Sequence, residues 1–353
     1  MLTLNKATNE TRTILKVLLI IIAIAFAFLI IAKIAALIKN IVIPPQPAKP
    51  TMAYGKLPKI SFTTSTINTK FTFSIDTISG SLPTFPSLVK IYKVSTSQPN
   101  LLSLNNAKGI VANDGFNSNP LRLSDKLYQW FLPVGDTNFD VAKQLTMNIY
   151  SLNFDLNSTY LNNPVVLTGA NLPAPADAIQ VAQDFLDQMS LFPGDIDSTK
   201  TVPGLFSINS LNLVPATSFS TTQIIRVDFF QKNLDGIPIV YSSPFGSSMS
   251  FLIAGGSQQG QVVEAHFSHS EWSNNDYATY PIKSSQQLFN DLVQGKGNII
   301  AYEGSLRNIT ITDAYLAYYI DQNQKFFMPI MVFKGNNNFY AYLSAVNDQW
   351  VEN

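Results

Sequence analysis

A run of apolar residues near the N-terminus constrains this chain more than any other segment. Residues Val17–Ala32 carry no charge, and the run extends to Ile38. At 1.5 Å per residue, a helix over the whole run would reach about 33 Å, enough to cross a bilayer core of about 30 Å. We therefore expect a cytoplasmic tail over residues 1–13 and a transmembrane helix over residues 14–38. This predicts a single-pass protein of the cell membrane.

A cleaved signal peptide is the alternative interpretation of this run. The apolar stretch exceeds the usual signal-peptide core of about 7–15 residues, and no clear A-x-A cleavage site follows it. Lys33 does not exclude a span, because its long side chain can carry the ammonium group to the lipid headgroups. The residues therefore favour an uncleaved anchor.

The charge of the remaining chain narrows the class of partner. Residues 61–353 contain 15 Lys and Arg against 22 Asp and Glu, a net charge of −7. Such a surface argues against a nucleic-acid partner and favours an extracytoplasmic C-terminal part. The chain has no cysteine, which excludes a disulfide scaffold, a thiol nucleophile and a thiolate metal site. Composition leaves the oligomeric state open.

Four prolines between positions 44 and 50 indicate a stalk, which we place over residues 39–59, because proline removes backbone donors and favours an extended chain. The part that follows is longer than one core usually covers. It repeats a pattern of one short helix and several strands. We therefore expect an α+β fold of two or three modules, each a short helix packed on an antiparallel β-meander, over residues 60–172, 173–272 and 273–353.

The helix signals are clearest in the second and third modules. Pro175 opens a segment whose apolar residues recur at spacings of three and four. Ser284 is a cap candidate for a helix that Gly295 ends. The first module is less regular, with a possible helix over Leu102–Ala112. The alternative organisation is one small β-rich domain followed by a two-module domain.

A tight turn lies within the second module. Asn233-Leu234-Asp235-Gly236 separates two apolar stretches, and Gly236 supplies the glycine that a tight reversal requires. The segment Phe229–Tyr241 resembles the strand–turn–strand of PepSY and thermolysin-propeptide modules. A membrane-tethered protease inhibitor or folding chaperone is one function that this resemblance implies.

The aromatic strands of residues 314–346 are similar to the closing meander of YycI/YycH-type proteins. That resemblance implies a non-enzymatic extracytoplasmic domain, anchored by a single membrane pass, that regulates an envelope sensor or another membrane complex. It carries over no catalytic residue and no cofactor. It implies another envelope protein as the partner.

Nine Tyr and Phe residues lie between positions 315 and 342. Alternation places some of them on each face of a sheet, and one helix covers only one face. The other face must be covered by a neighbouring module or by a partner, because large exposed aromatic patches are unusual. The candidate partner-binding residues are Tyr315, Tyr318, Phe327, Phe333, Tyr340 and Tyr342.

The only two histidines suggest a metal or acid–base cluster at first sight. On a strand, however, Glu264 and His266 face one way and His269 faces the other, so the two imidazoles cannot converge. We expect two polar side chains at a strand tip, and a weak metal or proton-sensing site is the alternative.

Other polar motifs are equally unspecific. Asp195 with Asp197, and Asp136 with Asp140, lack the spacing of a calcium loop and indicate solvated turns. Gly255–Gly260 indicates a hairpin loop, because a strand rather than a helix follows it. Catalytic signatures such as H-E-x-x-H and G-x-S-x-G are absent from the sequence. We therefore predict a protein that is not an enzyme and that uses no cofactor or metal.

Overall fold

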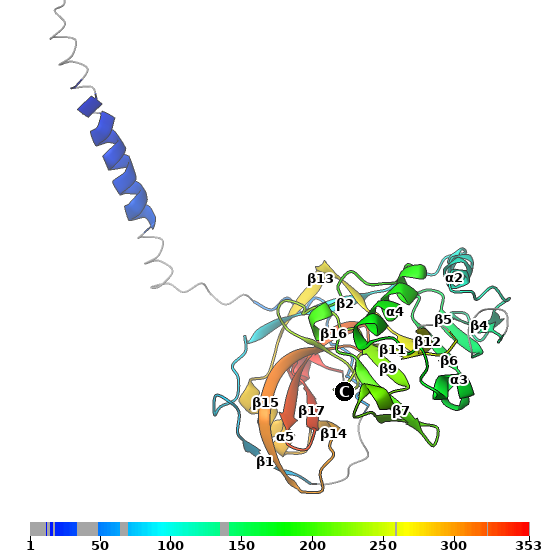
Figure 1. Ribbon diagram of the computed structural model, residues 1–353. Coiled ribbons are helices and arrows are strands. Elements are labelled where there is room, and N and C mark those ends of the chain that lie inside the picture. The colour runs from blue at the N-terminus through cyan, green and yellow to red at the C-terminus, as the bar shows by residue number, and fades with distance from the viewer. Residues whose placement is uncertain are drawn as a thin grey trace, which may run out of the picture. The chain divides into compact units, whose positions relative to one another are not determined.

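The computed structural model divides the chain into two compact units, residues 1–49 and 50–353 (Figure 1). The residues that it describes are 12, 15–16, 18–33, 49–63, 70–134, 141–257, 260–322 and 324–352.

The first unit corrects the prediction of a membrane anchor. Its residues 18–33 are helical. Residues 14, 17 and 34–38 of the predicted span, and all of the predicted tail except Arg12, lie outside the described residues. In the part of the chain that the structure describes, no helix has both the length and the apolar character needed to cross a membrane. This finding contradicts the predicted single-pass helix and the cell-membrane location drawn from it.

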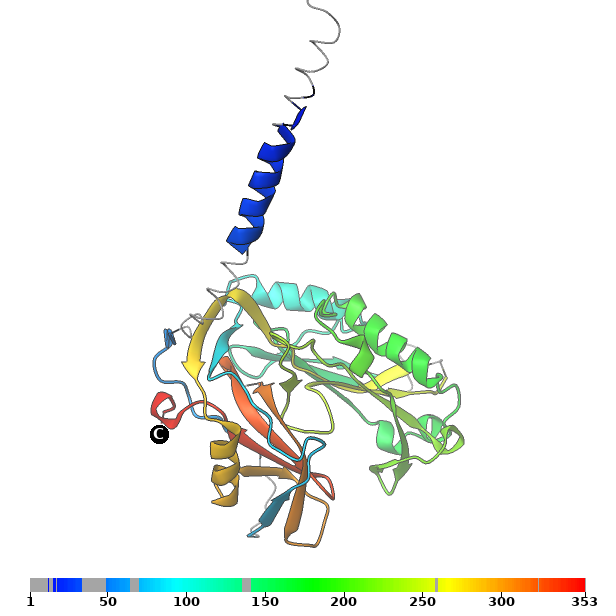
Figure 2. The same ribbon diagram turned by 90° about the vertical axis from the view of Figure 1, so that its left-hand side faces the viewer.

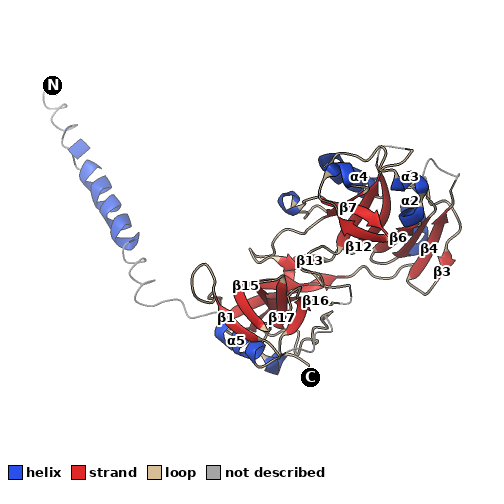
Figure 3. Cartoon of the chain, turned by 60° about the horizontal axis from the view of Figure 1, so that its bottom comes forward, coloured by secondary structure: helices blue, strands red, loops and turns tan. Residues whose placement is uncertain are grey.

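The second unit is built mainly from two large β-sheets (Figure 3). The nine-stranded sheet has the spatial order β3 (Leu121–Arg122), β4 (Leu127–Leu132), β5 (Lys143–Asn148), β6 (Phe154–Ser158), β12 (Gln261–Phe267), β11 (Met249–Ala254), β9 (Ile224–Asp228), β7 (Gly204–Asn209) and β8 (Asn212–Pro215).

The eight-stranded sheet runs in the order β1 (Thr72–Ile75), β15 (Asn308–Tyr319), β16 (Phe326–Gly335), β17 (Phe339–Ser344) and β14 (Asn298–Ala301). Off this path, β2 (Leu88–Ser95) pairs with β16 and β13 (Glu271–Pro281), and β10 (Ile239–Val240) pairs with β15. Strands β1 and β10 run parallel to β15, and the other pairs are antiparallel.

Helices are few and short among the described residues of this unit. The α-helices are α2 (Ser103–Ala112), α3 (Pro164–Leu167), α4 (Pro175–Gln188) and α5 (Ser285–Val293). The 3₁₀ helices are η1 (Tyr160–Asn162), η2 (Ser198–Lys200), η3 (Phe219–Thr221) and η4 (Asp348–Trp350). The predicted α+β class was therefore wrong: this is a mainly β fold of two extended sheets, not a row of helix-plus-meander modules.

One lobe is inserted into the other. Strand β2 ends at Ser95 and β13 begins at Glu271, and these two residues are paired neighbours. The chain between them, residues 96–270, forms the nine-stranded sheet and contributes β10 to the other sheet. We call residues 96–270 the insert lobe and residues 50–95 with 271–352 the outer lobe. The expected modules over residues 60–172, 173–272 and 273–353 do not coincide with these lobes.

One face of the nine-stranded sheet is covered by α2 and α4 (Figure 2). Pro175 occupies the first turn of α4, as its missing N–H allows, and the buried Ala178, Ala182 and Leu186 lie along one stripe. In the described part of the chain, the opposite face is covered at one end, where η1 and α3 pack Tyr160 and Val166 on the sheet.

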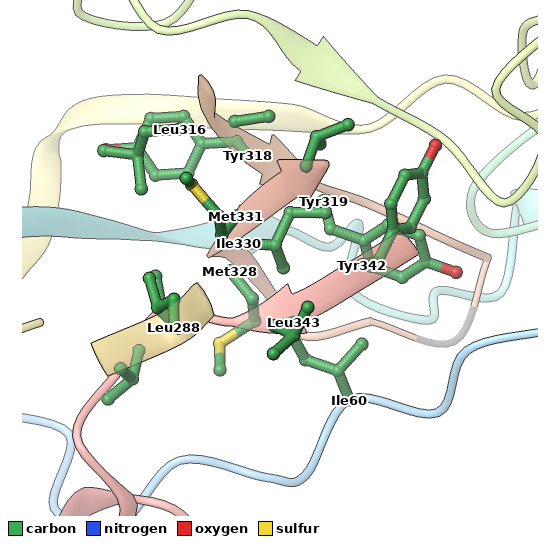
Figure 4. Packing of buried hydrophobic residues seen from close by; sticks show 14 of the residues in the cluster. Ile60, Leu288, Leu316, Tyr318, Tyr319, Met328, Ile330, Met331, Tyr342 and Leu343 are labelled. Atoms are coloured by element: carbon green, nitrogen blue, oxygen red, sulfur yellow. The ribbon is translucent and has the colours of Figure 1, made fainter. Parts of the chain in front are cut away.

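The outer lobe packs α5 and the chain before β1 onto its sheet. Ser284 and Gln287 form a capping box at the start of α5, and Leu57 is fully buried beside Val351. Leu57 belongs to the segment predicted as a stalk, so the folded unit begins before residue 60. Figure 4 shows part of this core, with Leu288 from α5, Tyr318 from β15, Met331 from β16 and Leu343 from β17.

Candidate functional site

The face of the nine-stranded sheet that α2 and α4 leave open carries two polar rows. In one row, His266 of β12 is the register partner of both Ser250 of β11 and Asp155 of β6. In the next row, Leu252 is the partner of both Arg226 and Glu264. Because directly opposed residues of neighbouring strands share a face, these side chains lie together.

A hollow of about 470 Å³ opens over these two rows. Its lining combines apolar and charged side chains from β7, β8, β9, β11 and β12 and from the loop before β11: Phe206, Leu213, Arg226, Ser247, Ser250, Leu252, Glu264 and His266. We call it the His266 hollow. It has the mixed character of a ligand-binding site, with apolar walls and a few polar groups.

Arg226 is held within the hollow by an internal partner. Its Nε lies 2.8 Å from Asp228 Oδ2, and its Nη2 donates to Asp228 Oδ1 at 3.0 Å. The backbone N–H of Ser247 donates to the same carboxylate. The Nε contact is an ion pair without a hydrogen bond, so the bond from Nη2 and the charge of Asp228 together hold the guanidinium and offset its charge.

Glu264 has a different environment. Its Oε2 accepts a hydrogen bond from the Tyr160 hydroxyl at 3.0 Å, and burial together with this carboxylate raises the pKa of Tyr160, which therefore stays neutral. Among the described residues, Glu264 forms no ion pair. The carboxylate thus remains a negative charge with one neutral donor.

Both ring nitrogens of His266 are occupied. Nδ1 lies 2.6 Å from Asp155 Oδ1, and Nε2 lies 3.2 Å from the side-chain nitrogen of Gln322, in the outer lobe. A carboxylate only accepts, so Nδ1 carries a proton toward Asp155, and Nε2 faces the Gln322 amide. In a Ser-His-Asp triad the second nitrogen faces the serine, whereas here it faces Gln322 rather than Ser250.

His269 lies beyond the end of β12 and has another partner. Its Nε2 is 2.9 Å from Asp195 Oδ1, and the side chain is only 12% exposed. Asp195 also accepts from Gln231 Nε2 at 2.8 Å. Burial acts to raise the pKa of Asp195, but the bonds from His269 and Gln231 outweigh it and hold that pKa below its usual value. The two imidazoles have different partners, and because His269 lies beyond the end of β12, strand alternation does not account for its position.

The remaining polar motifs lie in turns and loops. Asp195 pairs with His269, and Asp197 caps η2 by accepting from the Thr199 N–H. Asp136 and Asp140 lie outside the described residues. The segment 255–260 connects the antiparallel strands β11 and β12, which confirms the predicted hairpin loop. Within the described part of the chain, no three His, Cys, Asp or Glu residues gather in a way that could hold a metal ion.

The six aromatic candidates for partner binding lie in the core and at the edge of the outer lobe. Tyr318, Phe327 and Phe333 are fully buried and Tyr342 is 1% exposed, so the protein itself covers them. The other two, Tyr315 and Tyr340, are half-buried, and Phe245 of the insert lobe packs edge-on against Tyr340 with ring centroids 5.4 Å apart. Both sheet faces are therefore packed against other parts of this chain at these positions.

Sequence reasoning placed Glu264 and His266 on one face but missed their neighbours. Asp155, Tyr160 and Arg226 lie 38 to 111 positions away from them, so only the strand register could bring them together. The alternation of Phe154-Asp155-Leu156-Asn157 predicts a polar sheet face but does not indicate which strands lie beside it. Comparisons with protein-family models, with curated proteins and with solved structures found no match to this chain.

Proposed function

We propose that this chain is a non-enzymatic protein-binding domain with a regulatory role, and that the His266 hollow is where it binds its partner. The observation that carries the proposal is the incomplete cover of the nine-stranded sheet. One face is buried under α2 and α4, whereas η1 and α3 leave the polar end of the other face open. A partly apolar hollow on such a face is suited to a partner's side chains.

The hydrogen bonds around the hollow favour binding over catalysis. Arg226 is held by Asp228, and His266 is held between Asp155 and Gln322. Because these side chains are already fixed in place, they lose little conformational entropy when a partner binds. A catalytic base would need a free nitrogen directed at the reacting group, and the neighbour of Nε2 is an amide from the other lobe.

The position of the hollow supports a regulatory role. His266 contacts Gln322 of the outer lobe, and the loop that contributes Ser247 also places Phe245 against Tyr340. A partner seated in the hollow would therefore lie next to two of the contacts that join the lobes. A partner that binds one arrangement of these contacts more tightly would shift the lobe junction toward that arrangement.

Site-specific photocrosslinking in the cells that produce the protein tests the proposal. A photoreactive residue replaces Leu213 at the rim of the hollow, and a matched variant carries it at Leu306, which is 64% exposed on the outer lobe. We expect a discrete adduct with another protein from position 213 and none from position 306. The same adducts from both positions, or no adduct from position 213, would contradict the proposal.

A further inference from the structure

The geometry points to a lysine or arginine side chain of the partner as the group that occupies the His266 hollow. This inference rests on the proposed function, because it names the chemistry that the partner must present. Its first support is the charge of Glu264, which no cation in the described structure offsets. A carboxylate on a half-covered surface is stabilised most by a cation that also donates hydrogen bonds.

Arg226 does not supply that cation. One strand separates it from Glu264, since Leu252 lies between them in the register, which places their backbones about 10 Å apart. Its guanidinium is committed to Asp228. On the other side of the hollow, Asp155 is paired with His266, so that carboxylate has its own partner and leaves Glu264 unmatched. The hollow and its rim thus carry an excess of negative charge.

The apolar part of the lining matches the stem of such a side chain. Phe206 and Leu213 form partly buried walls that pack on the small core beneath α3, and Leu252 is 6% exposed between Arg226 and Glu264. Lysine and arginine carry a hydrocarbon stem with the charge at its end, and they bury the stem along apolar surface. A stem along these residues would direct the charged end to Glu264.

The charge of the whole insert lobe acts in the same direction. Residues 96–270 contain 7 Lys and Arg against 13 Asp and Glu, a net charge of −6. The outer lobe, residues 50–95 and 271–352, contains 10 Lys and Arg against 9 Asp and Glu, a net charge of +1. The negative field is therefore concentrated on the lobe that carries the hollow, where it would speed the approach of a basic segment.

Titration of the full chain with small probes tests the inference. The probes are N-acetylarginine amide and its neutral isostere N-acetylcitrulline amide. Because the chain has only two histidines, labelled His266 reports on the hollow by NMR, and His269 serves as an internal control. We expect the arginine probe to shift the His266 ring signals to saturation without moving those of His269, and the citrulline probe to bind at least ten-fold more weakly.

The variant Glu264→Gln keeps an oxygen for the Tyr160 hydroxyl and removes the charge. We expect it to weaken the arginine probe about ten-fold, whereas Glu303→Gln on the outer lobe leaves the affinity unchanged. Equal binding of both probes, no shift of His266, or unchanged affinity in Glu264→Gln would overturn the inference. If position 213 gives an adduct but any of these results is obtained, the inference of a lysine or arginine side chain is refuted, whereas the proposed binding site stands. Binding of the arginine probe without an adduct would refute the proposed partner protein instead.

Discussion

His266 Nδ1 lies 2.6 Å from Asp155 Oδ1, although 111 residues separate the two in sequence. The pair spans neighbouring strands on the open sheet face. Its side chains are 39% and 54% exposed, whereas His269 and Asp195 are 12% and 27% exposed. The same chemical pair therefore occurs twice, once with both side chains open to solvent and once with both side chains mostly covered.

The two pairs should differ in their effect on stability. We expect His269→Ala to lower the free energy of unfolding by about 2–3 kcal/mol, because it leaves a half-buried carboxylate without a charge-assisted partner. The matched variant His266→Ala should cost less than about 1 kcal/mol, because solvent screens its pair. Urea unfolding followed by circular dichroism measures both. Equal losses, or a larger loss for His266→Ala, would contradict this ranking.

Asp114 makes the stability of the insert lobe depend on pH. It is 9% exposed just after α2, and burial raises its pKa to about 6 although nearby Lys143 acts to lower it. In the folded state the protonated form of Asp114 is favoured. Its contribution to the free energy of unfolding is therefore fully present below the unfolded pKa of 3.8 and is lost as pH rises through about 6. That loss corresponds to about 3 kcal/mol.

The variant Asp114→Asn should remove this dependence. We expect the difference in unfolding free energy between wild type and variant to change by about 2 kcal/mol from pH 4 to pH 6.5 and to level off above pH 7. Thermal unfolding at a series of pH values measures the difference. A constant difference across the whole range would mean that Asp114 does not titrate in this window.

Lys143 should make stability change with pH in the opposite direction, at alkaline pH. Burial lowers its pKa to about 8, although Asp114 acts to raise it. Its folded form favours the neutral amine, so stability should rise with pH between about 8 and 10.5. Replacement by methionine, which keeps the length of the side chain, should abolish that rise in the same thermal assay. A rise that persists in Lys143→Met would assign it to another group.

Local sequence signals identified elements but not their partners. Pro175 and Ser284 correctly marked the starts of α4 and α5, because capping depends on neighbours within one turn. The turn at Asp235 and Gly236 is also confirmed, with φ of 52° and 77°. Its contacts were not predictable: Asp235 accepts a hydrogen bond from Tyr92 at 2.7 Å and pairs with Lys90 in the outer lobe.

Strand pairing explains most of the remaining differences. The apolar stretch around residues 204–215 is not one strand but the hairpin of β7 and β8, because Ser210 and Leu211 both turn with positive φ. Neither residue type signals such a turn. Strand β1 pairs in parallel with β15, so Thr72 lies opposite Asn308. The alternation of apolar and polar residues predicts which sheet face a side chain occupies. The register between strands more than 200 residues apart depends on the whole fold.

Gly255 lies where the loop before α4 packs onto the end of β11. A Cβ built on it would collide with the backbone oxygen of Ala170, whereas a Cβ on Gly109 within α2 would meet open space. We expect Gly255→Ala to destabilise the protein by about 2 kcal/mol or more, because backbone atoms must move. Gly109→Ala should stabilise it by about 0.5–1 kcal/mol. A tolerated Gly255→Ala in chemical denaturation would contradict the close approach of these loops.

The aromatic residues of the outer lobe should act through the core rather than through a partner. Phe333 is fully buried in β16 and packs against Phe289 of α5, with ring centroids 6.0 Å apart, so Phe333→Ala should lower the free energy of unfolding by about 3–5 kcal/mol. Tyr340→Ala, at a half-buried position, should cost about 1–2 kcal/mol, since it removes an edge-on contact with Phe245. Denaturant unfolding separates the two. Comparable small losses would mean that the β16 face is not packed as described, and that its aromatic side chains are available to a partner after all.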